Sequence, residues 1–325
     1  MTRLARAFWV TRPFEGEIRE SVLGAPASGE VMVEALYSSV SRGTEALVFQ
    51  GKVPETEYDR MRCPHQEGDF PGPLKYGYAS VGRVVEGPSA LSDRTVFCLY
   101  PHQSAYVVPI SSVVPLPPSV TSSRAVLAAN LETALNALWD ARPLAGDRIS
   151  VVGAGVLGCL FAYLARKIPA AEVELVDVRP ERAKVAEALG VSFATPDEAR
   201  KERDLVVHAS ASAEGLRTAL DLASSDVTVL ELSWFGDRAV ALPLGGAFHV
   251  KRLALRSSQV GTVSPNARGR FTHRARLELA LSFCADEALD VLFTSESSLS
   301  DLPATMRELC GASGGALCHR VRYDS

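Results

Sequence analysis

Three glycines in one hexapeptide are the clearest chemical signal in the sequence. The hexapeptide reads Gly153-Ala154-Gly155-Val156-Leu157-Gly158, a G-x-G-x-x-G pattern. It follows the apolar run 149–152 and opens a segment of helix formers, the context in which the pattern binds a dinucleotide. The first glycine permits a tight turn, the second leaves room for the pyrophosphate, and the third lets the helix pack on the strand. Backbone N–H groups at the helix start would then face the phosphates. A glycine-rich turn in an unrelated α/β protein is the alternative.

An acidic residue at the end of the next predicted strand indicates which dinucleotide would bind. Asp177 ends the run 173–177, where a carboxylate accepts hydrogen bonds from the adenosine ribose. Because its charge would repel a 2′-phosphate, Asp177 favours NAD(H) over NADP(H) as the cofactor. Arg179 and Arg182 follow closely and could accommodate that phosphate instead. A charge at a helix N-terminus is the structural alternative for Asp177.

The elements that must position these residues change character near Pro118. From Arg6 to about Pro117, short β-like runs are punctuated by Gly and Pro, which indicates a β-rich, partly open barrel. After Pro118, a helix-like segment over 124–142 precedes alternating strands and helices. The predicted strands are 148–152, 173–177, 204–208 and 227–232, and the predicted helices are 157–167, 180–189 and 213–223. This alternation is typical of a parallel, doubly wound sheet. We expect a nucleotide domain over 121–282 and a β-rich domain over 1–120, completed by 283–325.

Composition excludes several classes of protein. The chain has 325 residues, 47% hydrophobic and 22% charged, which favours two globular domains over disorder. With a net charge of -4 and no basic stripe, we expect no nucleic-acid partner, and we interpret the basic stretch 268–276 as a solvated helix face. The apolar run 149–165 is too short and too rich in glycine to span a membrane. The absence of an apolar leader and of any C-x-x-C pair predicts a cytoplasmic protein with reduced thiols.

The order of these segments resembles the medium-chain dehydrogenase/reductases, the superfamily of zinc alcohol dehydrogenases and quinone reductases. The segments that carry the resemblance are Ser41-Arg42-Gly43-Thr44-Glu45, Lys75-Tyr76-Gly77-Tyr78-Ala79-Ser80-Val81-Gly82, Asn130-Leu131-Glu132-Thr133-Ala134 and the glycine motif. The domain order matches from end to end. The resemblance implies an α/β fold class, with a GroES-like β-rich catalytic domain and a Rossmann nucleotide domain whose doubly wound sheet is parallel. It also implies an NAD(P)-dependent oxidoreductase.

The positions of the family's zinc ligands hold other residues in this chain. Zinc members carry C-G-T-D-x-H and G-H-E, and the matching Cys and His positions hold Arg42 and Tyr78. The third ligand position, four residues before Thr133, holds Ala129. Arginine and alanine cannot hold zinc, and a lone neutral tyrosine is a poor ligand. The four-cysteine loop of the structural zinc is also missing. The resemblance therefore implies an enzyme without zinc.

A zinc-less branch of the family has the same S-x-G-T-E and G-Y pattern. It includes the bacteriochlorophyllide dehydrogenase of bacteriochlorophyll synthesis, which oxidises a hydroxyethyl side chain. The likeness covers mainly the N-terminal half and the glycine motif. This chain departs from the branch at Ala79, where a glutamate is expected.

Without zinc, protein groups must handle the charge and proton of the substrate oxygen. The resemblance places the hydroxyl of Tyr78 in the cleft beside the nicotinamide and Thr44 at the position of the family's proton-relay hydroxyl. Arg42 would hold an anionic substrate group or a developing alkoxide, and His102 is a further candidate, with Lys75 and Glu132 weaker ones. Each has a structural alternative. Tyr78 could fill the metal void, Thr44 could bind its own backbone, Arg42 could pair with Glu45 or another acid, and His102 could be an exposed turn residue.

The resemblance also assigns residues to the nucleotide side. Its cofactor-binding positions are Gly153, Gly155, Val156, Leu157, Gly158, Asp177, Arg179, Thr133, Ser210, Ser233, Trp234, Ser258 and Gln259. The stretch 51–73, between two active-site segments, is either a lid over the substrate or a surface loop without a role.

Three functional hypotheses follow. The leading one is hydride transfer between NAD(H), with NADP less favoured, and a small-molecule alcohol or ketone. The others are an NADPH-dependent quinone or enone reductase, and a non-catalytic nucleotide-binding member of the family. A homodimer formed through the Rossmann sheet is the expected assembly.

Overall fold

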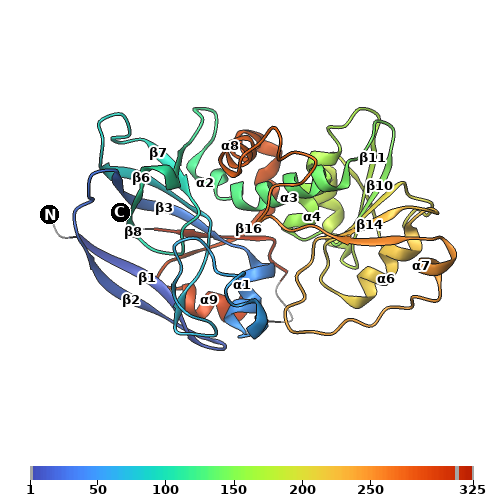
Figure 1. The fold of residues 1–325 in the computed structure, drawn as a ribbon, viewed down its shortest axis with the longest axis horizontal. Helices are drawn as coiled ribbons and strands as arrows, with labels where there is room; N and C mark the ends of the chain where they lie inside the picture. Colours follow the sequence, from blue (N-terminus) through green and yellow to red (C-terminus); the bar gives the residue numbers. More distant parts are fainter. Residues whose placement is uncertain (1–2, 312–314, 324–325) are drawn as a thin grey trace. The chain divides into compact units, whose positions relative to one another are not determined.

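A computed structural model describes residues 3–311 and 315–323 of the protein. Its strands belong to two separate units (Figure 1). Unit 1 comprises Met1–Ala129 and Leu281–Ser325, and unit 2 comprises Asn130–Ala280. The sequence-based boundaries were 120/121 and 282/283. The helix-forming segment after Pro118 therefore contributes its first part to unit 1.

Unit 2, whose residues are all described, contains one parallel sheet of six strands. The strands are β10 (Arg148–Val152), β11 (Glu172–Val176), β12 (Ser192–Ala194), β13 (Leu205–His208), β14 (Thr228–Glu231) and β15 (Ala254–Ser257). Their order is β12-β11-β10-β13-β14-β15, and every pairing is parallel. This 3-2-1-4-5-6 order is the Rossmann arrangement, so the predicted doubly wound sheet is confirmed. The two edge strands were not predicted, because they have only three or four residues and β15 is exposed throughout.

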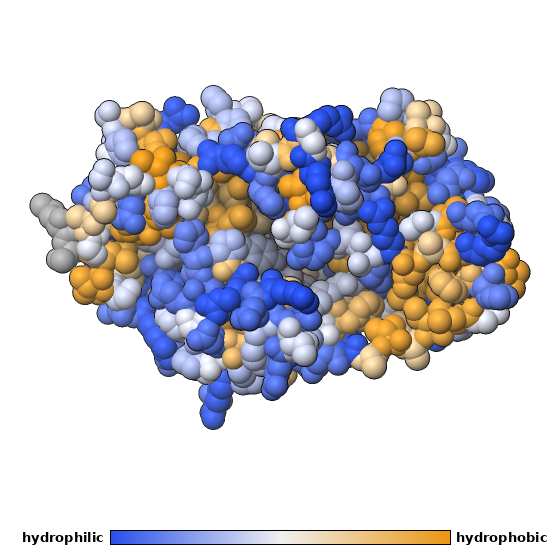
Figure 2. All heavy atoms as spheres, viewed as in Figure 1, coloured by the Kyte–Doolittle hydropathy of each residue, from blue (hydrophilic) through white to orange (hydrophobic). Residues whose placement is uncertain are grey.

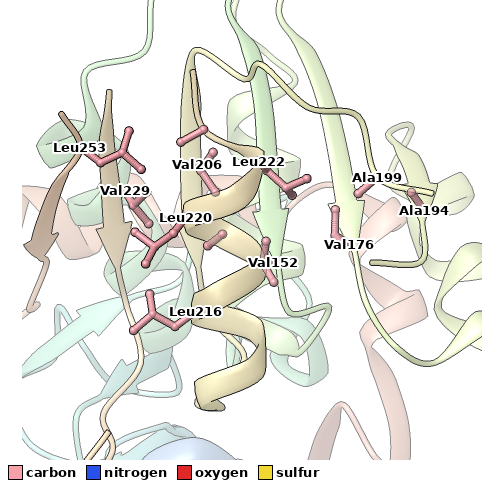
Figure 3. Packing of buried hydrophobic residues seen from close by; sticks show 12 residues of the cluster. Val152, Val176, Ala194, Ala199, Val206, Leu216, Leu220, Leu222, Val229 and Leu253 are labelled. Carbon is pink, nitrogen blue, oxygen red and sulfur yellow. The ribbon is translucent and has the colours of Figure 1, made fainter. Parts of the chain in front are cut away.

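Helices connect these strands, and the helices that follow β10, β11 and β13 pack against the sheet. They are α4 (Val156–Ala165), α5 (Ala183–Ala188), α6 (Ala213–Leu222) and α7 (Ala247–Val250), with α3 (Ala128–Ala141) before the sheet and α8 (His273–Phe283) after it. Figure 3 shows Leu216 and Leu220 of α6 pointing toward Val206 and Val229 of the sheet. Leucines four residues apart share one helix face, and removing such a buried side chain costs roughly 2–5 kcal/mol. This packing holds the start of α6 at the carboxyl edge of the sheet.

Unit 1 is built from two sheets in its described part. The larger sheet has the order β16-β17-β3-β6-β7-β9, with β8 also paired to β3, and the smaller has the order β2-β1-β5-β4. The strands of the larger are β3 (Glu30–Val40), β6 (Ser80–Glu86), β7 (Thr95–Cys98), β8 (Ala105–Pro109), β9 (Val113–Pro115), β16 (Phe293–Ser298) and β17 (Cys318–Arg322). Those of the smaller are β1 (Arg3–Arg12), β2 (Glu15–Leu23), β4 (Glu67–Gly68) and β5 (Leu74–Lys75). The C-terminal strand β17 pairs antiparallel with β3, so the tail returns to the N-terminal sheet.

One helix of unit 1 corrects the sequence analysis, which expected only strands and turns up to Pro117. Residues Arg42–Phe49 form α1. The segment has only eight residues, and its second and third residues, Gly43 and Thr44, are weak helix formers, so the sequence does not predict a helix there. Its buried residues include Leu47, Val48 and Phe49, so tertiary packing stabilises it. The described part of unit 1 also contains α2 (Ser122–Ala125) and α9 (Leu302–Leu309), with short 3-10 turns at Glu55–Glu57, Ile110–Ser112 and Glu287–Leu292. A further 3-10 turn, Pro180–Arg182, lies in unit 2.

Among residues 3–311 and 315–323, no helix has the length and apolar character needed to cross a membrane.

Candidate active site and nucleotide site

Tyr78 follows a glycine whose backbone no other residue would readily adopt. Gly77 has φ +133°, and a Cβ built on it would lie 3.1 Å from the ring of His102. A glycine therefore lets the chain pass the imidazole and enter the turn that precedes β6. Tyr78 lies in this turn, half-buried. The chain thus brings Tyr78 and His102, both predicted site residues, into one part of unit 1.

The hydroxyl of Tyr78 contacts two other hydroxyls at the start of α1. It forms side-chain hydrogen bonds with Ser41 and Thr44. Burial raises the pKa of Tyr78 far above its usual value, and the nearby charge of Glu45 raises it further, while the two hydroxyls only partly offset this. Tyr78 is therefore a neutral phenol at physiological pH. In this state it can donate a hydrogen bond.

A buried hydrogen-bonded chain lies behind these hydroxyls. His102 Nε2 is 2.8 Å from Glu45 Oε2, and His102 Nδ1 is 2.7 Å from Ser38 Oγ. Ser38 Oγ is in turn 2.8 Å from the hydroxyl of Tyr323, which follows β17. The other carboxylate oxygen of Glu45 accepts a hydrogen bond from the Ser41 N–H at 2.7 Å. His102 is only 1% exposed, so its interpretation as an exposed turn residue is wrong.

The remaining polar candidates have other partners. Arg42 Nη1 donates to the carbonyl of Ala316 at 3.1 Å, which ties the start of α1 to the C-terminal segment. Lys75 is buried, with its ammonium group bonded to Glu67 and, at 2.5 Å, to Gln103 Oε1. Burial lowers the pKa of Lys75, and Glu67 opposes that shift.

Aromatic rings connect the 51–73 stretch to Tyr78. The ring of Tyr58 lies 5.3 Å from that of Phe70, which lies 5.8 Å from the ring of Tyr76. Tyr76 meets Tyr78 edge to face at 6.1 Å, and its hydroxyl donates to the Met61 carbonyl at 3.0 Å. Such edge-to-face contacts restrict ring orientation. The stretch therefore supports the position of Tyr78 from one side.

The donor set around Tyr78 does not fit a zinc ion. In the described residues, no group of three or more His, Cys, Asp and Glu side chains is arranged to hold a metal. Both ring nitrogens of His102 are engaged by Glu45 and Ser38. Burial raises the pKa of the Cys63 thiol to about 12. Among the described residues, the side chains around Tyr78 therefore do not form a set of zinc ligands.

In unit 2, the glycine motif forms the loop between β10 and α4. Gly153 has φ +109°, and a Cβ on Gly158 would lie 2.0 Å from the Gly153 carbonyl, so both positions require glycine. A Cβ on Gly155 would meet nothing within 4 Å, which leaves open space at the N-cap of α4. Val156 and Leu157 are the first residues of this helix, and their N–H groups lack intrahelical partners. The loop therefore fits a dinucleotide pyrophosphate.

Asp177 lies just beyond β11 and contacts the glycine loop. Its Oδ2 accepts a hydrogen bond from the Ala154 N–H at 2.7 Å, and its Oδ1 accepts one from the Arg179 N–H at 3.0 Å. Of the two arginines that could accommodate a 2′-phosphate, Arg182 is only 7% exposed, whereas Arg179 is half-buried. Asp177 and Arg179 are therefore the charged side chains at this end of the loop that a ribose or its phosphate could meet.

Other predicted cofactor residues lie in unit 2, in four segments. Ser210 is in the loop after β13, and Ser233 and Trp234 follow β14. Ser258 follows β15, where its hydroxyl donates to Asp140 Oδ2 at 2.6 Å. Gln259 Oε1 accepts from the Gly261 N–H at 2.6 Å. Thr133 is on α3.

One residue of the basic stretch 268–276 departs from the predicted solvated helix face, whereas Arg268, Arg270, His273 and Arg274 are exposed as expected. Arg276 is 2% exposed, and its Nε lies 3.0 Å from Glu132 Oε1, while Nη1 donates to Asn136 Oδ1 at 2.6 Å. Glu132, considered above as a substrate group, is thus engaged in this pair, and burial raises its pKa. The periodicity of the sequence gave no sign that an arginine on α8 would pack inward.

Sequence reasoning missed several residues of these networks. Glu45 was considered only as a partner of Arg42, and Ser38 and Tyr323 were not considered. The sequence around each of them contains no motif that indicates a functional site. Only the pairing of strands that are distant in the sequence brings them together. The position of Glu45, directly after Thr44, was the one available signal.

Comparisons with known proteins agree on the fold. No protein-family model matches the chain. A 2-desacetyl-2-hydroxyethyl bacteriochlorophyllide A dehydrogenase from Cereibacter sphaeroides is 29% identical over 206 residues, covering 56% of this chain and 59% of the relative. L-idonate 5-dehydrogenase (NAD(P)(+)) from Escherichia coli is 24% identical over 207 residues, covering 62% and 58%. The chain thus spans less than two thirds of these curated relatives.

Solved structures match over the whole chain at lower identity. The structure of L-idonate 5-dehydrogenase from E. coli has a TM-score of 0.80 with 18% identity and covers 99% of each chain. A dehydrogenase of the zinc-binding type from Sinorhizobium meliloti, bound to NADP, has a TM-score of 0.77 with 17% identity, covering 98% of this chain and 99% of the other. An E. coli alcohol dehydrogenase with NADH has a TM-score of 0.75 with 14% identity, covering 98% and 99%. The named relatives and neighbours are dehydrogenases of the medium-chain dehydrogenase/reductase type. The predicted fold, a GroES-like domain with a Rossmann domain, is confirmed.

Proposed function

We propose that this protein is a zinc-independent oxidoreductase that transfers hydride between NAD(H) and an alcohol or ketone. The observation that carries the proposal is the neutral phenol of Tyr78, bonded to two hydroxyls at a position where zinc relatives have a metal ligand. Two named relatives act on a hydroxyethyl-bearing pigment and on a sugar acid, which supports a secondary alcohol as the substrate class.

The nicotinamide supplies or accepts the hydride when the dinucleotide is bound. In the reducing direction, the Tyr78 hydroxyl donates a hydrogen bond to the substrate oxygen and delivers its proton as negative charge develops there. The hydroxyls of Ser41 and Thr44 donate hydrogen bonds to the phenolate oxygen, and a proton from solvent then restores the phenol. His102 and Glu45 hold the start of α1, and with it these two hydroxyls, in place. Arg42, anchored at Ala316, holds an anionic group of the substrate.

The dinucleotide is held by the glycine loop of unit 2. Open space at Gly155 and the first N–H groups of α4 support pyrophosphate binding, and Asp177 supports NAD(H) over NADP(H). Thr133, Ser210, Ser233, Trp234, Ser258 and Gln259 complete the proposed cofactor site. Arg179 is the side chain that could bind the 2′-phosphate if the protein instead preferred NADP(H).

Two measurements test the proposed function. Nicotinamide fluorescence during titration with NADH and with NADPH tests binding and preference. Nicotinamide absorbance during incubation with a panel of secondary alcohols, ketones, enones and quinones tests turnover. We expect tighter NADH binding and turnover of an alcohol–ketone pair. Turnover of quinones or enones with NADPH alone would identify the enone-reductase alternative. Binding without any turnover would favour a non-catalytic nucleotide-binding protein.

We also propose that the protein forms a homodimer through the β15 edge of the Rossmann sheet. All four residues of β15 are exposed, and Leu244, Val250 and Leu255 are 52%, 76% and 39% exposed. Figure 2 shows hydrophobic side chains gathered over the end of unit 2 that carries α6 and α7. An unpaired edge strand beside apolar surface favours pairing with a second copy. Light scattering should give twice the chain mass, and Leu255→Asp should shift it toward the mass of one chain. A wild-type monomer at micromolar concentration would refute the proposal.

A further inference from the structure

A serine, a histidine and a glutamate in unit 2 are hydrogen-bonded in the chemical order of a hydrolase triad. Ser210 Oγ lies 2.6 Å from His208 Nε2, and His208 Nδ1 lies 2.6 Å from Glu231 Oε2. A nucleophile within reach of a base that a third group orients is the signature of covalent catalysis, and it recurs on unrelated folds. Ser210 also belongs to the proposed cofactor site, but the hydride transfer proposed above uses neither its proton nor the bonded order of Ser210, His208 and Glu231.

The triad is located where parallel sheets bind ligands. His208 ends β13 and Glu231 ends β14, and these residues are register partners in the sheet. Ser210 follows two residues later, in the loop before α6. Loops at the carboxyl edge of such sheets form binding crevices. The imidazole is fully buried while Ser210 is half-buried, so a ligand meets the Ser210 hydroxyl first, with His208 Nε2 directly behind it.

The hydrogen-bond partners fix the imidazole in the form that a base needs. A carboxylate only accepts hydrogen bonds, so Glu231 requires the proton on His208 Nδ1. Nε2 is then free to accept the proton of Ser210. Glu231 is itself held, because its Oε1 accepts a hydrogen bond from the Ser233 N–H at 2.6 Å. This second bond orients the carboxylate toward the ring.

The start of α6 packs directly on the nucleophile. A Cβ on Gly215 would lie 2.1 Å from Ser210 Oγ and 3.0 Å from His208 Nε2, so any side chain there would displace the triad. Ser212 is the N-cap of this ten-residue helix, and it accepts a hydrogen bond from the Gly215 N–H at 2.9 Å. The positive end of the helix therefore lies beside Ser210 and favours negative charge developing there.

We propose that Ser210 is a nucleophile activated by His208 and Glu231, and that the protein hydrolyses small carboxylic esters as a second activity. Ser210 Oγ attacks the carbonyl carbon while His208 Nε2 takes the hydroxyl proton. As the ester C–O bond breaks, His208 gives that proton to the departing alcohol, leaving an acyl group on Ser210. Water, deprotonated by His208, then attacks the acyl carbon, and the acid leaves as Ser210 regains its proton. The sum is ester plus water giving acid plus alcohol, with no redox partner.

The first test is hydrolysis of p-nitrophenyl acetate by the full chain, followed by nitrophenolate absorbance. We expect Ser210→Ala and His208→Gln to reduce the enzymatic rate by roughly a hundredfold or more, and Glu231→Gln by roughly tenfold. The matched control is Ser192→Ala, in β12 of the same unit, whose hydroxyl only donates to the Val173 carbonyl at 3.0 Å. It should keep the wild-type rate. Wild-type hydrolysis by Ser210→Ala would overturn the proposal, because surface groups would then be responsible.

The second test identifies the nucleophile in the unmodified protein and does not depend on whether the variants fold. A fluorophosphonate probe should attach to Ser210, as shown by mass spectrometry of the labelled peptide. Prior heat denaturation should abolish the labelling, because the triad exists only in the folded chain. Labelling of another residue, or no labelling and no hydrolysis by the folded protein, would refute the proposal. Neither result would affect the proposed hydride transfer, which is measured with NAD(H) and an alcohol.

Discussion

Glu45 and His102 form a buried pair that joins α1 to the segment before β8. The two side chains are 4% and 1% exposed, and Oε2 and Nε2 are 2.8 Å apart. Because the partner atoms lie on elements 57 residues apart in sequence, the pair fixes the start of α1 against the large sheet of unit 1. The hydroxyl groups of Ser41 and Thr44 that contact Tyr78 are held by this arrangement.

Removing one partner of this pair should destabilise the protein more than replacing both partners together. His102→Ala leaves Glu45 buried without its main side-chain partner, so we expect the free energy of unfolding to fall by about 3 kcal/mol or more. Adding Glu45→Gln to that variant should recover part of the loss. Denaturant unfolding of the two single variants and the double variant measures this coupling. His249→Ala, which removes an exposed histidine, is the control. Additivity within about 0.5 kcal/mol would contradict the pairing.

The purified protein should contain far less than stoichiometric zinc. The reason is the presence of Arg42, Tyr78 and Ala129 at the three positions where zinc relatives have their ligands. Elemental analysis after dialysis measures this, and a chelator should leave turnover and thermal stability unchanged. About one zinc per chain would show that a different donor set holds the metal.

Replacing Asp177 should narrow the difference in affinity between NADH and NADPH. Asp177→Asn removes the charge that repels a 2′-phosphate but keeps an oxygen that can accept the Ala154 N–H. Asp177→Ala also removes that acceptor. A loss of cofactor affinity that occurs only with alanine would therefore result from a change in the glycine loop and not from the loss of charge. Fluorescence titration of both cofactors measures the two dissociation constants. If the wild-type protein already binds NADPH tenfold more tightly, about 1.4 kcal/mol, then Arg179 determines the preference.

The sequence predicted the central Rossmann strands better than it predicted the site. Strands such as 148–152 are apolar runs bounded by turn residues, and the glycine motif has a local backbone requirement, so both leave a signal in a short window. The partners of His102 do not, because Glu45, Ser38 and Tyr323 come together only through the pairing of β3 with β17 and the packing of α1. The buried position of Arg276 was hidden for the same reason, since its partner Glu132 is on another helix.

Tyr78→Phe separates the two roles considered for this side chain. The substitution keeps the ring and its edge-to-face contact with Tyr76 but removes the hydroxyl that contacts Ser41 and Thr44. If the hydroxyl donates a proton to the substrate oxygen, turnover should fall by roughly a hundredfold or more, while NADH affinity stays unchanged. The melting temperature should change little, because the ring still fills its place. Thr44→Val, which removes only the second hydroxyl of the relay, should have a smaller effect on turnover. A fully active Tyr78→Phe would show that the ring is only a filler and would make Thr44 and His102 the next residues to test.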